Sequence, residues 1–195
     1  MKWFLLGIVF GMALILVGVY EFAIRGYVDF RADQQPSASE TRVAMDAVDA
    51  FMMRYAPNVK SPVPPTEQNV AAGAKIYLDH CAGCHGVPSN PESRFSRSFY
   101  PAAPGFFKDS PDMPEQHNFY VVQHGIRWTG MPAWSGTLSD TEMWEVVTFL
   151  GAIDNLPPSA RDVFAPGAAS PPASAPTPSP ALSKSGAMRM PMPMH

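Results

Sequence analysis

Two cysteines and a histidine stand together near the middle of the chain and could act as one chemical unit. Cys81 and Cys84 are the only cysteines among 195 residues, and His85 follows directly in the order Cys-Ala-Gly-Cys-His. This spacing is typical of covalent haem attachment, in which two thiols bind the haem and the adjacent imidazole reaches its iron. The motif therefore predicts one covalently bound haem c.

Two other kinds of site use a similar cysteine pair. A redox dithiol of the thioredoxin type would need strands alternating with helices around it, and no strand-rich segment flanks the motif. A structural zinc site would need a second pair of ligands, and the chain has only this one pair of cysteines. Both alternatives fit the sequence less well than haem attachment.

The iron of a low-spin haem needs a sixth ligand, and a thioether in that position favours the reduced state. Met131 is the best placed, because Gly130 allows the backbone to approach closely and Pro132 stiffens the loop between two expected helices. Met143 is expected in the core, and a site with two histidines stays as an alternative. The further candidates are Met113, His80, His117 and His124.

Two helices are expected to position these groups. One begins after Thr66, a residue type that caps helices, and leads directly to Cys81. The other begins after Ser139, and Glu142 completes a capping box. The apolar positions on these helices are Val70, Ala74, Tyr77 and Leu78 on the first, and Met143, Val146, Val147, Leu150 and Ile153 on the second. Gly73 offers a bare patch where the second helix could cross.

The amino-terminal segment can span a membrane. Residues 3–20 carry no charge, and as a helix they would be about 27 Å long, close to the thickness of the hydrocarbon core. The apolar run is longer than that of a cleaved signal peptide and ends without small residues. We therefore interpret residues 1–24 as an uncleaved transmembrane signal-anchor.

A linker, residues 25–65, follows the anchor. Ser37 and Glu40 have capping-box spacing, and the apolar residues after them repeat with helical spacing. These residues are Ala44, Val48, Phe51, Met52 and Tyr55. An amphipathic helix is expected at about residues 38–55, followed by a proline-rich extended stretch.

The carboxy-terminal residues 157–195 contain ten prolines among alanine and serine. This composition has too little apolar content to fold, so a disordered Pro/Ala/Met-rich tail is expected. The tail ends in Met188, Met190, Met192, Met194 and His195, soft ligands that Cu(I) prefers. Copper handling by this tail is a further, weaker hypothesis.

The charge of the chain speaks against binding to nucleic acid. The formal net charge is −3, and the basic residues are scattered. Residues 66–156 hold five basic and ten acidic side chains, a net charge near −5. Docking through a ring of lysines is therefore not expected.

Residues 66–156 resemble a class I c-type cytochrome domain. The likeness rests on Gly73 and Tyr77, on the Cys81–Gly86 motif, on the stretch from His124 to Pro132 and on the closing aromatic helix. It implies an all-α fold, with Cys81 and Cys84 anchoring the haem, His85 as the proximal ligand and Met131 as the distal ligand. In that family a proline carbonyl orients the proximal imidazole, and Pro88, Pro101 and Pro104 all remain candidates.

The resemblance also implies a location and a function. Haem is attached to such motifs outside the cytoplasmic membrane, so a single-pass protein of a bacterium is expected, with its haem domain in the periplasm. Because both axial positions are filled, we expect an electron carrier between redox proteins of a respiratory chain, without enzymatic activity or a small-molecule substrate. A fixed subunit of a dehydrogenase or oxidase complex is the alternative. Apolar residues expected around the ring are Phe106, Phe119, Val122, Ile126, Trp128 and Trp134.

Overall fold

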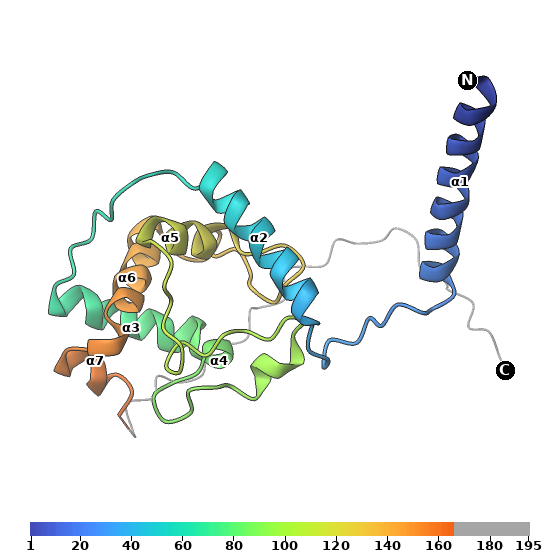
Figure 1. Cartoon of the computed structure of the whole chain (residues 1–195). Helices are drawn as coiled ribbons and strands as arrows, with labels where there is room; N and C mark the ends of the chain where they lie inside the picture. Colours follow the sequence, from blue (N-terminus) through green and yellow to red (C-terminus); the bar gives the residue numbers. More distant parts are fainter. Residues whose placement is uncertain (166–195) are drawn as a thin grey trace, which may run out of the picture.

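The computed structural model describes residues 1–165, which are helical, with no β-strand in that range (Figure 1). The all-α class is thereby confirmed. The elements are α1 (Lys2–Ile24), α2 (Ala38–Tyr55), α3 (Glu67–His80), α4 (Ala82–His85), η1 (Phe95–Ser98), α5 (Glu115–His124), α6 (Asp140–Gly151), η2 (Ile153–Asn155) and α7 (Pro158–Asp162). The methionine-rich end that could bind Cu(I), and the predicted disorder from residue 166 onward, lie outside the described residues.

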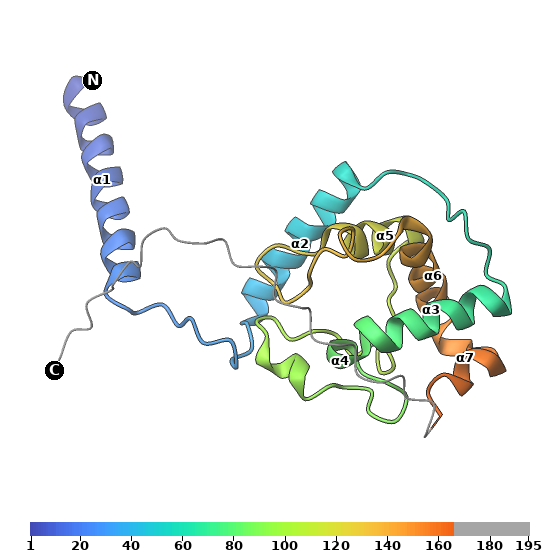
Figure 2. The same cartoon turned by 180° about the vertical axis from the view of Figure 1, so that it is seen from behind.

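Helix α1 stands apart from the other helices in both views (Figures 1 and 2). None of its side chains is buried. It is the one helix within residues 1–165 that is long and apolar enough to cross a membrane. Residues 25–37 join it to α2 without forming a helix. The predicted apolar helix at the amino terminus is therefore present, with its whole surface free for lipid.

Helices α3 and α6 cross at Gly73 and form the centre of the domain. A Cβ atom at position 73 would collide with the carbonyl oxygen of Glu145 and lie 2.9 Å from the Cβ of Phe149. Only glycine lets the two backbones approach this closely. The expected crossing is thus confirmed, as are the caps Thr66 on α3 and Ser139 on α6.

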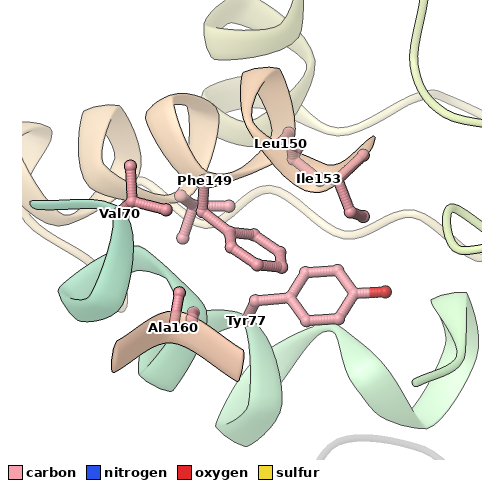
Figure 3. Close-up of a cluster of buried hydrophobic side chains, with 8 residues drawn as sticks. Val70, Tyr77, Phe149, Leu150, Ile153 and Ala160 are labelled. Atoms are coloured by element: carbon pink, nitrogen blue, oxygen red, sulfur yellow. The ribbon is translucent and has the colours of Figure 1, made fainter. Parts of the chain in front are cut away.

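The side chains of this crossing form a dry cluster (Figure 3). Tyr77 is fully buried, with its ring 4.9 Å from that of Phe149. Its hydroxyl donates a hydrogen bond of 2.9 Å to the carbonyl oxygen of Gly86, and burial raises the pKa of Tyr77, so the hydroxyl stays a donor. The core of α3 and α6 is thereby bonded directly to the residue that follows His85.

A second cluster packs α5 against α6. The rings of Phe119 and Trp144 stack 4.1 Å apart, and Met143 is 1% exposed. Met143 is therefore a core residue, as expected. Met131 and Trp134 pack on the edge of this cluster.

Residues 157–165 belong to the folded part of the chain. Pro158 begins α7, where a proline costs no intrahelical hydrogen bond. Ala160 of α7 is fully buried, and the ring of Phe164 lies 5.9 Å from that of Phe149. The predicted start of the disordered tail at residue 157 is therefore too early, because these prolines initiate a helix rather than prevent one.

Helix α2 has the expected bounds, with Ser37 accepting a hydrogen bond from the backbone of Glu40. It lies on the outside of the domain, beside α5, in both views (Figures 1 and 2). Met52 is its one buried residue, and the contacts at its two ends are Phe51 with Tyr120 and Glu40 with Tyr100. Most of its predicted apolar face is exposed to solvent.

Candidate functional site

The cysteine pair and the histidine lie on one helical turn at the end of α3. Cys81 caps α3, and its carbonyl oxygen accepts hydrogen bonds from the backbone of Cys84 (3.1 Å) and of His85 (2.9 Å). Both cysteines are free thiols. The short helix α4 thus brings together the three groups that the motif predicts to act as a unit.

The His85 imidazole is held from two sides. Its Nδ1 lies 2.8 Å from the carbonyl oxygen of Pro104, and because a carbonyl only accepts, Nδ1 carries the proton. The ring of Phe106 stacks on it 4.2 Å away and nearly parallel. Among the three candidate prolines, Pro104 is the one bonded to the ring. The Nε2 lone pair is left for a metal, which is the usual arrangement of a ligating histidine.

The imidazole is also in the right protonation state to bind a metal. His85 is 9% exposed, and burial lowers its pKa, while the hydrogen bond to Pro104 raises it in part. Burial dominates, so the neutral form is favoured near pH 7.

The thiols do not have the properties of a redox dithiol. Burial raises the pKa of Cys81 to about 12, with a smaller contribution from Cys84, and burial also raises the pKa of Cys84. A catalytic cysteine pair needs a lowered pKa, because the thiolate is the nucleophile. Together with the lack of strands in residues 1–165, this speaks against a thioredoxin-like function.

Met131 lies on the loop between α5 and α6. Its carbonyl oxygen accepts a hydrogen bond of 3.2 Å from the backbone of Ile126, and its own N–H donates to Oγ1 of Thr129 (3.1 Å). The Thr129 hydroxyl donates in turn to the carbonyl oxygen of Ile126 (2.7 Å). Sequence reasoning did not single out Thr129, although threonine two residues before a loop position commonly closes such turns.

The other candidate ligands have different surroundings. The His80 ring lies 5.2 Å from that of Trp134, and the His124 ring 4.5 Å from that of Tyr120. Met113 and His117 lie near the start of α5. No group of three His, Cys, Asp or Glu side chains within residues 1–165 could hold a metal ion.

Trp128 differs from most of the apolar residues expected around the ring in being fully accessible on the described chain. Its side chain is 89% exposed, and its φ angle of 62° is in the left-handed region. Phe119 and Val122, two others of the expected set, are buried.

These residues fit a covalently bound haem. Two protonated thiols on one turn can form thioethers, an imidazole offers a free Nε2, and a partly buried thioether lies on a separate loop. Nitrogen and sulfur are the axial donors of low-spin haem carriers.

Comparison with known proteins agrees with this chemistry. Residues 68–150, less than half of the chain, match the model of the family described as cytochrome c oxidase, cbb3-type, subunit III. A search of the curated proteins gives no significant match.

One similar solved chain comes from the reducing HAO-like protein complex of Kuenenia stuttgartiensis. It is 21% identical with a TM-score of 0.42, and the match covers 60% of this chain. This chain spans about three fifths of that one, 61% of its length. The family match thus identifies a c-type cytochrome domain within residues 68–150, and α1 is long and apolar enough to anchor it in a membrane.

Proposed function

We propose that this protein is a membrane-tethered electron carrier with one haem c, bound through Cys81 and Cys84 and ligated by His85 and Met131. The family match supports a haem c electron carrier. The observation that carries the residue assignment is the 2.8 Å contact between Nδ1 of His85 and the carbonyl of Pro104, because it leaves Nε2 free on the turn that holds both thiols.

The bound haem would supply a one-electron couple, ferric to ferrous. The thiols of Cys81 and Cys84 would hold it as thioethers, formed by adding S–H across its two vinyl groups without consumption of an oxidant. Their raised pKa keeps them protonated before attachment. The Pro104 carbonyl orients the His85 ring and increases the basicity of Nε2.

Met131 would provide the second axial ligand. A thioether stabilises ferrous iron and raises the reduction potential. With His85 and Met131 both bound, no axial position is left for oxygen, peroxide or another substrate. Outer-sphere electron transfer between redox proteins is therefore the function that we propose, rather than catalysis.

We place the haem domain in the periplasm of a bacterium, with the amino end of α1 inside the cell. Haem attachment outside the cytoplasmic membrane is the reason for this orientation. Cell fractionation tests the tether. The full-length protein should require detergent for release, whereas a chain without residues 1–33 should be soluble with the same haem spectrum. Full-length protein in the periplasmic fraction without detergent would refute the anchor.

Haem attachment is tested by extraction with acidified acetone. The haem should stay with the unmodified protein, and Cys81→Ala and Cys84→Ala should each lose one thioether link, seen in the pyridine haemochrome spectrum. Replacement of Ser139 by Ala, which leaves the motif intact, is the control. Haem that leaves the unmodified protein freely would refute attachment at this motif.

A fixed subunit of a dehydrogenase or oxidase complex is the second candidate. The observation that favours it is α2, whose exposed apolar side chains could pack against a neighbouring subunit. They are Val43, Met45, Phe51, Met53 and Tyr55. Purification from membranes in mild detergent separates the two functions. A stoichiometric enzyme partner would support the subunit, and a haem protein recovered alone would support the free carrier.

A further inference from the structure

Trp128 combines a strained backbone with an exposed side chain. It is the one non-glycine residue in the described chain with a positive φ. For an L-residue this conformation costs about 1–2 kcal/mol. The indole is 89% exposed and therefore returns little burial energy. Packing among the described residues does not explain a tryptophan at this position.

Hydrogen bonds within the loop close the turn that carries Trp128. Thr129 bonds to Ile126 through both its N–H (3.3 Å) and its hydroxyl (2.7 Å). The guanidinium of Arg127 lies 5.9 Å from the centre of the indole, within the range of a cation–π contact. The same loop carries Met131 three residues further on.

Phe99 connects this loop to η1. A Cβ atom at Gly130 would lie 2.6 Å from the Phe99 ring, so that ring covers the backbone of the Met131 loop. Phe95 packs edge-on against Phe99 with ring centres 5.0 Å apart, and it is itself 58% exposed. Phe99 thus joins the segment that carries the exposed Phe95 to the loop that carries the exposed Trp128.

The charge of these two segments is opposite to that of the domain. Residues 94–99 and 126–131 contain Arg94, Arg97 and Arg127 and no acidic residue, whereas residues 66–156 as a whole have ten acidic side chains against five basic ones. Arg97 lies 3.5 Å from Glu92, and within residues 1–165 no ion pair involves Arg94 or Arg127. These two segments, which meet at Phe99 and Gly130, therefore carry positive charge on an otherwise acidic domain.

We propose that this arginine–aromatic surface, formed by Arg94, Phe95, Arg97, Arg127 and Trp128, docks a redox protein whose own docking face is acidic. The proposal rests on the proposed function, because it places the partner beside a ligand of the iron. Exposed tryptophan and arginine are the residues that contribute most to protein interfaces, and opposite charges speed and orient the encounter. An anionic lipid surface has the same charge but exchanges no electrons, so a protein is the occupant that an electron carrier needs.

Electron transfer to small charged oxidants tests the local field. The full-length reduced holoprotein in neutral detergent is mixed with hexacyanoferrate(III), an anion, and with tris(phenanthroline)cobalt(III), a cation. The net charge of the domain predicts that salt speeds the reaction with the anion, because it screens repulsion. The arginine–aromatic surface predicts the reverse: the rate constant with the anion falls as salt rises.

Single-charge variants locate the effect. Arg127→Gln and Arg94→Gln should each lower the rate constant with the anion at low salt by about 2–10-fold, a share of the 10–10³-fold that a charged surface provides. Lys75→Gln removes one positive charge from α3 and should change the rate constant with the anion less than either arginine variant does. Equal effects of all three variants, or a rate constant that rises with salt, would overturn the proposal. A missing haem spectrum would instead refute the proposed function.

An acidic blue copper protein, with a basic one for comparison, serves as the probe for docking. Trp128→Ala should slow electron exchange with the acidic protein and leave exchange with hexacyanoferrate(III) unchanged, because a small ion needs no apolar contact. Trp3→Ala in α1 is the matched control. Electron exchange that is faster with the basic protein than with the acidic one would overturn the proposal. So would loss of the anion reaction in nanodiscs with anionic lipid, since lipid would then cover the surface.

Discussion

The two sides of the proposed haem site, around His85 and around Met131, are held by different kinds of structure. His85 lies on a helical turn bonded to the main core, with its ring between the Pro104 carbonyl and Phe106. Met131 lies on a turn whose own hydrogen bonds run within residues 126–131, and the loop is tied to α5 by two backbone bonds, from Trp134 to Val122 and from Ser135 to Gln123. The His85 side is therefore part of the global fold, whereas the Met131 side can open by local rearrangement. We expect the sixth ligand to be the first to yield to mutation or stress.

Loss of His85 should have the largest effect. His85→Ala removes the proximal ligand and the group that Pro104 and Phe106 hold, so no stable holoprotein should accumulate. The ratio of haem staining to immunoblot signal in membranes measures the fraction of the protein that carries haem. His124→Ala, which changes an exposed histidine, should give normal holoprotein. Normal haem content in His85→Ala would contradict the assignment.

Loss of Met131 should free one coordination position of the iron without loss of the haem. Met131→Ala should keep its covalent haem, bind carbon monoxide in the reduced state and show a lower reduction potential, because the soft ligand for ferrous iron is gone. Potentiometric titration and carbon monoxide difference spectra measure both changes. Met113→Leu is the matched control. A Met131→Ala protein that retains the ferric methionine-to-iron band would show that another residue is the ligand.

Removal of one hydroxyl on the His85 side should weaken the whole fold. Tyr77→Phe deletes the hydrogen bond to Gly86 and leaves a buried carbonyl oxygen without that partner, at a cost of about 1–3 kcal/mol in the free energy of unfolding. Urea titration of the holoprotein measures it. Tyr55→Phe, on the exposed face of α2, should change that free energy by less than about 0.5 kcal/mol. Equal free energies of unfolding for the two variants would mean that the hydrogen bond from Tyr77 to Gly86 does not stabilise the fold.

A matched change on the Met131 side should stay local. Thr129→Val removes the hydroxyl that bonds Ile126 and Met131. The free energy needed to open the loop should fall by about 0.5–1.5 kcal/mol. Carbon monoxide should then bind the reduced protein about two- to tenfold faster, while the urea midpoint changes little. Thr137→Val is the control. A large loss of global stability, with no change in the carbon monoxide rate, would contradict a locally opening loop.

The parts of the fold that the sequence could predict depend on local signals. Thr66 and Ser139 cap their helices through hydrogen bonds within three residues, and Gly73 marks the crossing because no other residue fits there. The cysteine motif lies on one turn because its spacing is itself helical. Each of these features can be recognised without knowledge of the rest of the chain.

The features that sequence reasoning missed depend on distant contacts. Pro104 is selected among three prolines by a bond across 19 residues, in a stretch without periodicity. The fold of residues 157–165 requires a core to pack on, which a count of prolines does not reveal. The left-handed backbone of Trp128 and the exposure of its side chain have no signal in the sequence around it.

The segment between α1 and α2 sets how far the haem domain can travel. Residues 25–37 are 13 residues without helix, and fully extended they reach about 45 Å. A domain confined to that distance from its anchor meets a membrane-bound partner at an effective concentration of about millimolar. Partner affinities weaker than those of freely diffusing carriers would then suffice, and fast release, rather than tight binding, would govern the rate of turnover.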